Sequence, residues 1–521
     1  MKTTTKNTAL LLMLSSSLLL GACSSTAPKN SMASVQSAVN KNFPLVKLDE
    51  NFINTPAATT PVNLASALQL PDALQLLFTH SPEVRIELAK LGVADAQQLQ
   101  AELISNPHIA LGAMRPEGGG RWKLETGLSQ PLLELFTRPL RRTMAEQNLL
   151  RTQLQLQAAL QRLIIKTQNN YYNALAATQH LQVQTQVVAA SKAQQALALS
   201  LYRAGNMAEN QFLYYDNELR HQQQAWNERK LTAEQKRIQL LTHLGLASTS
   251  ELELPQHLPL LSNQALDKHQ LMMQAQDHRL DAKIIQQQLK LAQQRKALLK
   301  QEKGWRDMSL GINAEREPDS SNNLGAEIEF GLPLFNRNQG KLAILDAQIN
   351  GLEAELQQQQ LQMDREISTA LLAVNTAQQQ LGLINTALQV AQKRVDLAQR
   401  EVNFMLTSPF ELLAIKGDEI QLAHDYTDTL KRYWLAHSQL ELAVGKSLST
   451  TSPAAHNSHS VHSQMDHSQM DHSKMDHSKM DHSKMDHSKM DHSKMNHNDH
   501  HPDHSKHDAP QANEHEEHNH D

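Results

Sequence analysis

The sequence contains two copies of one layout, and this repetition restricts its fold more than any other feature. Pro131 and Pro333 each close a stretch of alternating apolar and polar residues, and they are 202 residues apart. The same spacing separates Ala145 from Ala347, in the long segments that follow the two prolines. An internal duplication is the simplest explanation, so we expect two copies of one structural unit.

Each copy contains two adjacent segments in which apolar residues alternate with polar ones, as in a β-hairpin. The expected strands are 108–114 and 122–132 in the first copy, and 309–314 and 326–332 in the second. Turn residues 117–120 and 317–320 separate the two strands of each hairpin. One face of each strand is apolar and the other is rich in Glu, Lys and Gly, a pattern typical of strands with lipid on one side and water on the other.

Four such strands are too few to close a barrel. An open sheet edge within lipid would leave backbone N–H and C=O groups unsatisfied, so several protomers would have to share one barrel. Three protomers would supply twelve strands. The alternative is a pair of small soluble β-ribbons, which either hairpin alone would also fit.

Long helical segments accompany the hairpins. The segment 138–203 would form a helix of about 100 Å, whereas 207–246 and 72–104 would measure about 60 Å and about 50 Å. One long helix therefore matches two shorter helices placed end to end, and 277–303 and 338–405 are the equivalent segments of the second copy. A broken apolar stripe along 138–203 indicates a helix buried on one side. The helices alone would also fit a coiled-coil rod.

Composition and charge exclude several classes of protein. Only 4% of the residues are aromatic, which favours long helices over a large globular core. The net charge is −5, and the tail alone holds 13 Asp or Glu against 6 Lys, so the rest of the chain is nearly neutral and we expect no nucleic-acid partner. No apolar run reaches 18 residues, so no transmembrane helix is expected. The sequence contains no catalytic constellation, and we expect no enzyme activity.

The N-terminus has the features of a secretory signal. Lys2 and Lys6 precede the apolar stretch 9–20, and Leu20-Gly21-Ala22-Cys23 follows. This ending resembles a bacterial lipobox, so we expect residues 1–22 to be removed and Cys23 to carry lipid, including palmitate. Ser24 after the cysteine fits sorting to the outer membrane. The alternative is a plain signal peptide; since Cys23 is the chain's single cysteine, the chain has no disulfide.

The C-terminal tail repeats the sequence Met-Asp-His-Ser-Lys/Gln six times, followed by a degenerate seventh copy. Residues 451–521 hold 17 of the 27 histidines and 7 of the 18 methionines, but no Phe, Trp, Tyr, Leu or Ile, so they have no apolar surface with which to form a core. The expected metal ligands are Met465, His467, Met470, His472, Met475, His477, Met480, His482, Met485, His487, Met490, His492, Met495, His497, His500, His501, His504 and His507.

These side chains favour copper as the bound metal. Thioethers suit Cu(I) and Ag(I), whereas imidazoles suit copper, zinc and nickel. Zinc or nickel alone would not require a methionine at every fifth position, so we favour copper, with silver as a surrogate. Zinc, cobalt, nickel and cadmium are alternatives, and a solvated tail without function is another. A ligating histidine must be neutral, so binding should weaken below about pH 6.5.

Other ionisable residues give no comparable signal. The ten histidines outside the tail are scattered, and we expect each to be packed or solvated. Four acidic residues near helix ends are candidates for channel constrictions, although ordinary solvated charge is the simpler expectation. They are Asp216, Glu218, Asp418 and Glu419.

Several motifs resemble those of the TolC family of outer-membrane efflux channels, over about residues 64–448. The most specific runs from Gly331 to Gly340 (Gly-Leu-Pro-Leu-Phe-Asn-Arg-Asn-Gln-Gly) and resembles the strand-to-helix signature of the heavy-metal (CzcC/CusC-like) branch. Residues 202–206 resemble the tip of the family's first helical hairpin, and 440–445 its closing helix.

This resemblance implies a mainly α fold with a small β part. In it, a homotrimer forms a twelve-stranded barrel in outer-membrane lipid and a long periplasmic α-helical tunnel. It also implies a periplasmic adaptor and an inner-membrane pump of the resistance-nodulation-division (RND) type as partners. The channel itself would need no cofactor. The implied adaptor-docking residues are Tyr202, Gly205, Thr407 and Ser408.

The chain departs from the family pattern in three places. Residues 134–139 replace a Gly-Arg-rich stretch, the second tip near 406–409 lacks a glycine, and the tail is an addition. The first two departures leave the detailed geometry of the helix entry and of the second tip open, without affecting the expected fold.

We therefore expect a copper-exporting outer-membrane channel with a metal-capturing tail in the periplasm. A TolC-type channel for drugs or other small molecules, and a lipid-anchored metal-sequestration protein without a pore, are the alternatives. The expected organisation is a signal peptide (1–22), a lipidated N-terminal linker (23–63), a first efflux repeat (64–262), a second efflux repeat (263–448) and a disordered tail (449–521).

Overall fold

The computed structural model describes residues 31–46, 67–261, 266–301, 308–332 and 334–448. The chain divides into two compact units, Met1–Pro453 and Ala454–Asp521, and all described residues belong to the first. The predictions for the signal peptide, for Cys23 and for the metal-binding tail lie outside the described residues, as does Pro333.

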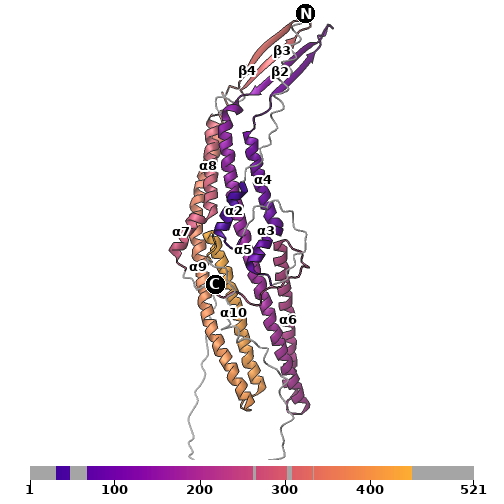
Figure 1. Ribbon diagram of the computed structural model, residues 1–521, viewed down its shortest axis with the longest axis vertical. Helices are drawn as coiled ribbons and strands as arrows, with labels where there is room; N and C mark the ends of the chain where they lie inside the picture. The colour runs from indigo at the N-terminus through magenta and orange to yellow at the C-terminus, as the bar shows by residue number, and fades with distance from the viewer. Residues whose placement is uncertain (1–30, 47–66, 262–265, 302–307, 333, 449–521) are drawn as a thin grey trace, which may run out of the picture. The chain divides into compact units, whose positions relative to one another are not determined.

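The described chain is mainly helical with one small sheet (Figure 1), as predicted. The first part contains α2 (Ser31–Asn42), α3 (Leu70–His80), α4 (Pro82–Glu102), β1 (His108–Met114), β2 (Lys123–Pro131), α5 (Leu133–Arg203) and α6 (Glu209–Leu244). The second contains α7 (Lys268–His278), α8 (Leu280–Gln301), β3 (Ser309–Arg316), β4 (Asn322–Glu329), α9 (Gln339–Asn403) and α10 (Pro409–Val444).

Each long helix packs against two shorter ones, as the expected lengths require. The N-terminal part of α5 contacts α4, where Asn148 Nδ2 donates to Gln97 Oε1 over 3.2 Å. Its C-terminal part contacts α6, where Trp226 Nε1 donates to Thr185 Oγ1 over 3.0 Å. In the second copy α9 contacts α8 and α10 in the same way (Figure 1).

The helices expected over 72–104 and 277–303 are each broken, so the prediction of single helices was wrong. Ser81 has extended backbone (φ −68°, ψ 125°) between α3 and α4, because the ring of Pro82 disfavours helical geometry in the residue before it. Arg279 has nearly the same conformation (φ −66°, ψ 131°) between α7 and α8 without a following proline. Its guanidinium instead bonds Asp281 and Glu366.

Two other boundaries differ from the sequence expectation. Helix α5 begins at Leu133, five residues earlier than predicted, and contains Pro139 in its second turn. Strand β4 ends at Glu329, before the predicted limit of Leu332. Pro139 has no backbone N–H to donate to the carbonyl of Leu135, so α5 lacks one helical hydrogen bond at this point.

The main hydrophobic core forms where both long helix pairs meet. Leu160 and Ile164 of α5, Leu240 of α6 and Leu440 of α10 are fully buried there. Tyr172 of α5 stacks on Trp434 of α10, with ring centroids 5.3 Å apart. Helix α2 also packs on this core through buried valines, so part of the segment predicted as a linker is folded.

Candidate functional site

The four strands form one antiparallel sheet in the order β1-β2-β3-β4, and their register aligns the apolar side chains of both hairpins. Ile109 pairs with Leu128, Leu128 with Ile312, and Ile312 with Ala326. Since side chains alternate between faces along a strand, these residues share one face of the sheet. That face is exposed: Leu111 and Leu324 retain 78% and 79% of their accessible surface.

The opposite face of the sheet is charged. Lys123 Nζ lies 3.1 Å from Glu125, 3.3 Å from Glu315 and 3.2 Å from Glu317, so one lysine joins both hairpins. Asn313 Nδ2 donates to Glu327 Oε2 over 2.6 Å on the same face. The sheet therefore separates an apolar surface from an ionic one, as the alternating pattern predicts.

The outer edges of the sheet have no partner within the described chain. Strands β1 and β4 are the first and last in the order, and each is paired on one side. Their free backbone groups can bond water or another strand, but not lipid. A sheet with an exposed apolar face and two open edges is therefore incomplete as a membrane element in a single protomer.

The turns between α5 and α6 and between α9 and α10 have the same backbone. Gly205 has a left-handed φ of 73°, and the N–H of Asn206 donates to the carbonyl of Leu201 over 2.9 Å. Met405 has a left-handed φ of 57°, and the N–H of Leu406 donates to Glu401 over 2.9 Å. Both are Schellman-type helix ends. The missing glycine in the second copy thus leaves the turn geometry unchanged, because Met405 adopts the strained conformation.

The predicted docking residues all lie at these turns, and three have local structural roles. Tyr202 stacks on Phe212 with ring centroids 5.4 Å apart. Ser408 caps α10 by accepting from the N–H of Glu411 over 3.2 Å, and Thr407 Oγ1 donates to the carboxylate of Glu411 over 2.5 Å. The second turn also exposes three large apolar side chains, those of Phe404, Met405 and Leu406.

Helix α9 carries an exposed apolar stripe that α8 and α10 leave uncovered. Leu361, Leu372 and Leu383 are 11 residues apart, and Leu383, Val390 and Leu397 are 7 residues apart. Repeats of 11 and 7 keep a side chain on one face of a coiled coil. Exposure of 75% at Leu361 and 73% at Leu383 is unusual for leucine in water and indicates a contact surface.

Four of the described histidines are buried, His180, His243, His424 and His437, which no short-range signal in the sequence revealed. His180 and His424 stack on each other, although they are 244 residues apart in the chain. His243 Nε2 lies 3.0 Å from Thr167 Oγ1, and burial lowers the pKa of this imidazole. Glu419, expected to be solvated, is instead 7% exposed and bonds Lys416.

The described residues contain no group of three or more His, Cys, Asp or Glu side chains placed to hold a metal ion. The predicted ligands of the tail lie outside them. Among the described helices, none is both long enough and apolar enough to cross a membrane.

Comparison with solved structures identifies the same fold in outer-membrane channels. The chain is 17% identical to CusC, over 73% of this chain and 92% of CusC, with a TM-score of 0.60. A membrane protein from Pseudomonas aeruginosa is 14% identical over 75% of this chain and 99% of its own, with a TM-score of 0.60. The outer membrane protein VceC from Vibrio cholerae is 14% identical over 73% and 97%, with a TM-score of 0.59.

No family model matches the sequence, and no curated protein matches it either. The structural likeness confirms the predicted fold class, that of the TolC-like outer-membrane channels.

Proposed function

We propose that this protein is the outer-membrane channel of a tripartite heavy-metal efflux system, which exports copper or silver ions from the periplasm to the exterior. The observation that carries the proposal is the sheet, whose four strands share one exposed apolar face and leave two open edges. Three protomers would join these edges into a twelve-stranded barrel with the apolar face toward lipid and the Lys123 face toward water.

The helices support the same assembly. The exposed stripe on α9, from Leu361 to Leu397, has coiled-coil spacing and would be buried against a neighbouring protomer. Trimerisation would thereby surround a helical tunnel continuous with the barrel. Lipid on Cys23 would anchor the protein to the outer membrane, with the helices and the tail in the periplasm.

The partners of such a channel would be a periplasmic adaptor protein and an inner-membrane RND pump. The adaptor would dock at the turns that contain Tyr202, Gly205, Thr407 and Ser408, which lie at the ends of the helices away from the sheet (Figure 1). Energy for transport would come from the pump.

The tail is the basis for proposing copper as the cargo. Its regular Met-x-His units combine soft thioether and imidazole ligands. A flexible chain of this length has an r.m.s. reach of about 45 Å, enough to sample metal around the tunnel wall. We infer that many weak sites raise the local copper concentration near the export complex.

Cell-associated metal tests the proposal. A host without its own efflux channel, but with the cognate pump and adaptor, would receive full-length protein, a version ending at Thr450, or nothing. A third version would replace the seven repeat methionines by leucine at constant tail length. Mass spectrometry would then measure Cu, Ag, Zn, Co, Ni and Cd in the cells.

Full-length protein should lower cellular copper, and the truncated and leucine versions should do so less well. Unchanged metal content in all strains would reject metal export and favour a drug channel. Absence of ion conductance by the purified protein in planar bilayers would reject any channel and leave the sequestration protein.

A further inference from the structure

A histidine pair joins the two helical hairpins, α5–α6 and α9–α10. His180 Nδ1 of α5 lies 2.8 Å from His424 Nδ1 of α10, and the rings stack with centroids 5.1 Å apart. The two residues are 5% and 8% exposed, so water cannot replace their contact. Two imidazole nitrogens at this distance share one hydrogen between them.

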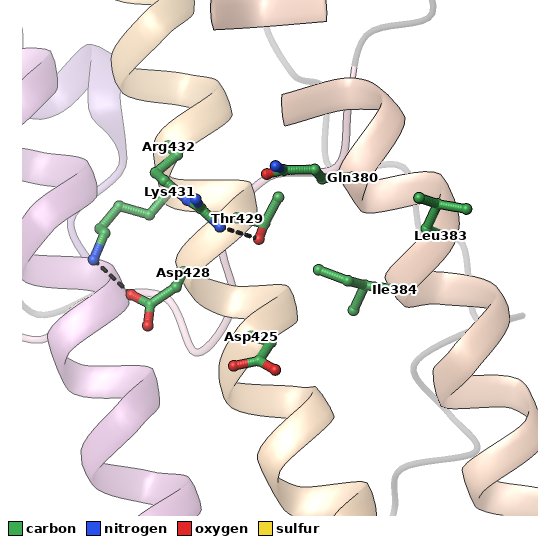
Figure 2. A pocket seen from close by; sticks show the side chains of 8 residues that line it. All are labelled: Gln380, Leu383, Ile384, Asp425, Asp428, Thr429, Lys431 and Arg432. Atoms are coloured by element: carbon green, nitrogen blue, oxygen red, sulfur yellow. Dashed lines mark hydrogen bonds and ion pairs between the residues drawn. The ribbon is translucent and has the colours of Figure 1, made fainter. Parts of the chain in front are cut away.

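A carboxylate orients the pair. His180 Nε2 donates to Asp428 Oδ1 over 3.1 Å, and Lys431 Nζ donates to the same oxygen over 2.7 Å. Both contacts hold the pKa of Asp428 well below its usual range, with the hydrogen bond from His180 the larger cause. In Figure 2, Asp428 and Lys431 extend from the side of α10 opposite Gln380, Leu383 and Ile384 of α9.

The hydrogen bonds of the pair can accommodate one added proton but not two. When both rings are neutral, His424 Nδ1–H donates to His180 Nδ1. When the pair gains one proton, His180 donates from Nε2 to Asp428 and from Nδ1 to His424. His424 then carries its hydrogen on Nε2 and accepts at Nδ1, so every bond is kept. When both rings are protonated, two N–H groups face each other at 2.8 Å, so the hydrogen bond is lost and two positive charges repel.

The charged groups around His424 come from three helices. His180 faces it from α5 and Arg229 from α6, whereas Asp425 and Asp428 lie on its own helix. Helix α9 contributes the uncharged side chains Gln380, Leu383 and Ile384 to the adjoining groove of about 540 Å³. Burial, followed by His180 and Arg229, lowers the pKa of His424 to about 4.

We propose that the His180–His424 pair is an acid-sensitive latch that holds α5 to α10 and releases these helices when a second proton binds. This inference concerns the helical body and does not depend on the cargo. The histidine pair lies between two other contacts of the hairpins. On the core side Gln168 bonds Glu441, and toward the turns Tyr215 stacks on Phe410 with ring centroids 4.6 Å apart.

The pH range follows from linkage. A His424 exposed by opening would have its ordinary pKa of 6.5, whereas the closed latch holds that pKa near 4. The open form therefore binds more protons between these values, and opening becomes more favourable as pH falls from about 6.5 to 4. The opening constant should rise roughly thirtyfold between pH 7.5 and pH 5.

Hydrogen–deuterium exchange of the full-length protein in detergent tests the latch. Amide exchange over 174–187 and 417–431, corrected for the intrinsic effect of pH, reports the loosening of α5 and α10 that follows release of the latch. Exchange at the histidine C2 position, followed by mass spectrometry, titrates His424 in the same sample. Wild-type protein should lose protection in both segments as pH falls from 7.5 to 5, with C2 exchange still placing the His424 titration near pH 4.

Two variants separate the latch from general acid sensitivity. His424→Gln keeps an N–H donor for His180 but cannot bind a proton, so protection should become independent of pH. His437→Gln removes another buried histidine of α10, and it should retain the wild-type response. The proposal would be overturned if amide protection in wild-type protein did not change with pH, or if His424 titrated near pH 6.5. It would also be overturned if His437→Gln lost the pH response while His424→Gln kept it. Since the first two outcomes need no variant, a misfolded substitution does not prevent the test.

Discussion

Gly245 ends α6 directly against the backbone carbonyl of His80, so close that no side chain fits between them. The contact lies at the break between α3 and α4. The second copy has the same arrangement: Gly445 ends α10, and a Cβ built on it would lie 2.9 Å from the carbonyl oxygen of His278. Both glycines are left-handed, with φ of 82° and 83°. The duplicated chain therefore has two matching junctions in which a helix end fits into a helix break.

Substitution of Gly245 by alanine should be strongly destabilising. The new methyl group would meet the His80 carbonyl, and the left-handed backbone adds about 1 kcal/mol of strain. We expect a total loss of roughly 2–4 kcal/mol in the free energy of unfolding, measured by denaturant titration.

Gly351→Ala is the matched control, because Gly351 lies within α9 and a methyl group added there would have no neighbour within 4 Å. It should be neutral or stabilise by up to about 1 kcal/mol. Equal effects of the two substitutions would contradict the packing described for Gly245.

The second turn should gain stability from a glycine. Met405 is 84% exposed and has a φ of 57°, so it contributes strain and little burial. Met405→Gly should stabilise the protein by about 0.5–1 kcal/mol, seen as a higher unfolding midpoint. The reverse change in the first turn, Gly205→Met, should cost a similar amount. A lower midpoint for Met405→Gly would mean that the side chain makes a stabilising contact in the assembled protein.

A lysine substitution should reduce assembly on the apolar face of the sheet but be tolerated on the ionic face. Ile312→Lys places an ammonium group on the apolar face, which costs about 2–4 kcal/mol if that face contacts the bilayer centre. Asn313→Lys, one residue further on, places it on the ionic face beside Glu327. The yield of folded trimer in outer-membrane fractions should fall for Ile312→Lys alone. Equal yields would show that the apolar face does not contact lipid.

Local sequence patterns predicted the strands well because alternation is a short-range signal. The apolar residues expected at Leu124 and Leu310 do lie on one face, and Pro131 ends β2. Both helix breaks were missed, the one at Ser81 although Pro82 follows it. The break at Arg279 has no proline after it, and one of the two carboxylates that bond its guanidinium, Glu366, is 87 residues away.

The histidine latch could not be predicted for the same reason. His180 and His424 lie on helices whose relative rotation depends on packing over the whole core, and neither has a sequence neighbour that marks it. The turns are a partial exception: the resemblance located both, at 202–206 and near 406–409. The left-handed φ of Met405 was not predicted, since strain supplied by surrounding structure leaves no pattern in the sequence.

The segment that leads into the tail is held by a buried carboxylate. Glu441 is 2% exposed; its Oε1 accepts from Ser447 Oγ and from the N–H of Leu448, each over 2.9 Å. Its Oε2 accepts from Gln168 Nε2 of α5 over 3.2 Å. Glu441→Gln replaces one acceptor oxygen by a donor group, which leaves at least one buried donor unpaired.

Glu441→Gln should therefore cost about 1–3 kcal/mol of stability and increase amide exchange at residues 446–448. Ser447→Ala, which removes one of these bonds and leaves the carboxylate in place, should cost about 1 kcal/mol and loosen the segment less. Denaturant titration and hydrogen exchange of the two variants measure both effects. If Ser447→Ala lowered stability more than Glu441→Gln, the Ser447 hydroxyl rather than the Glu441 carboxylate would be the main group that holds residues 446–448.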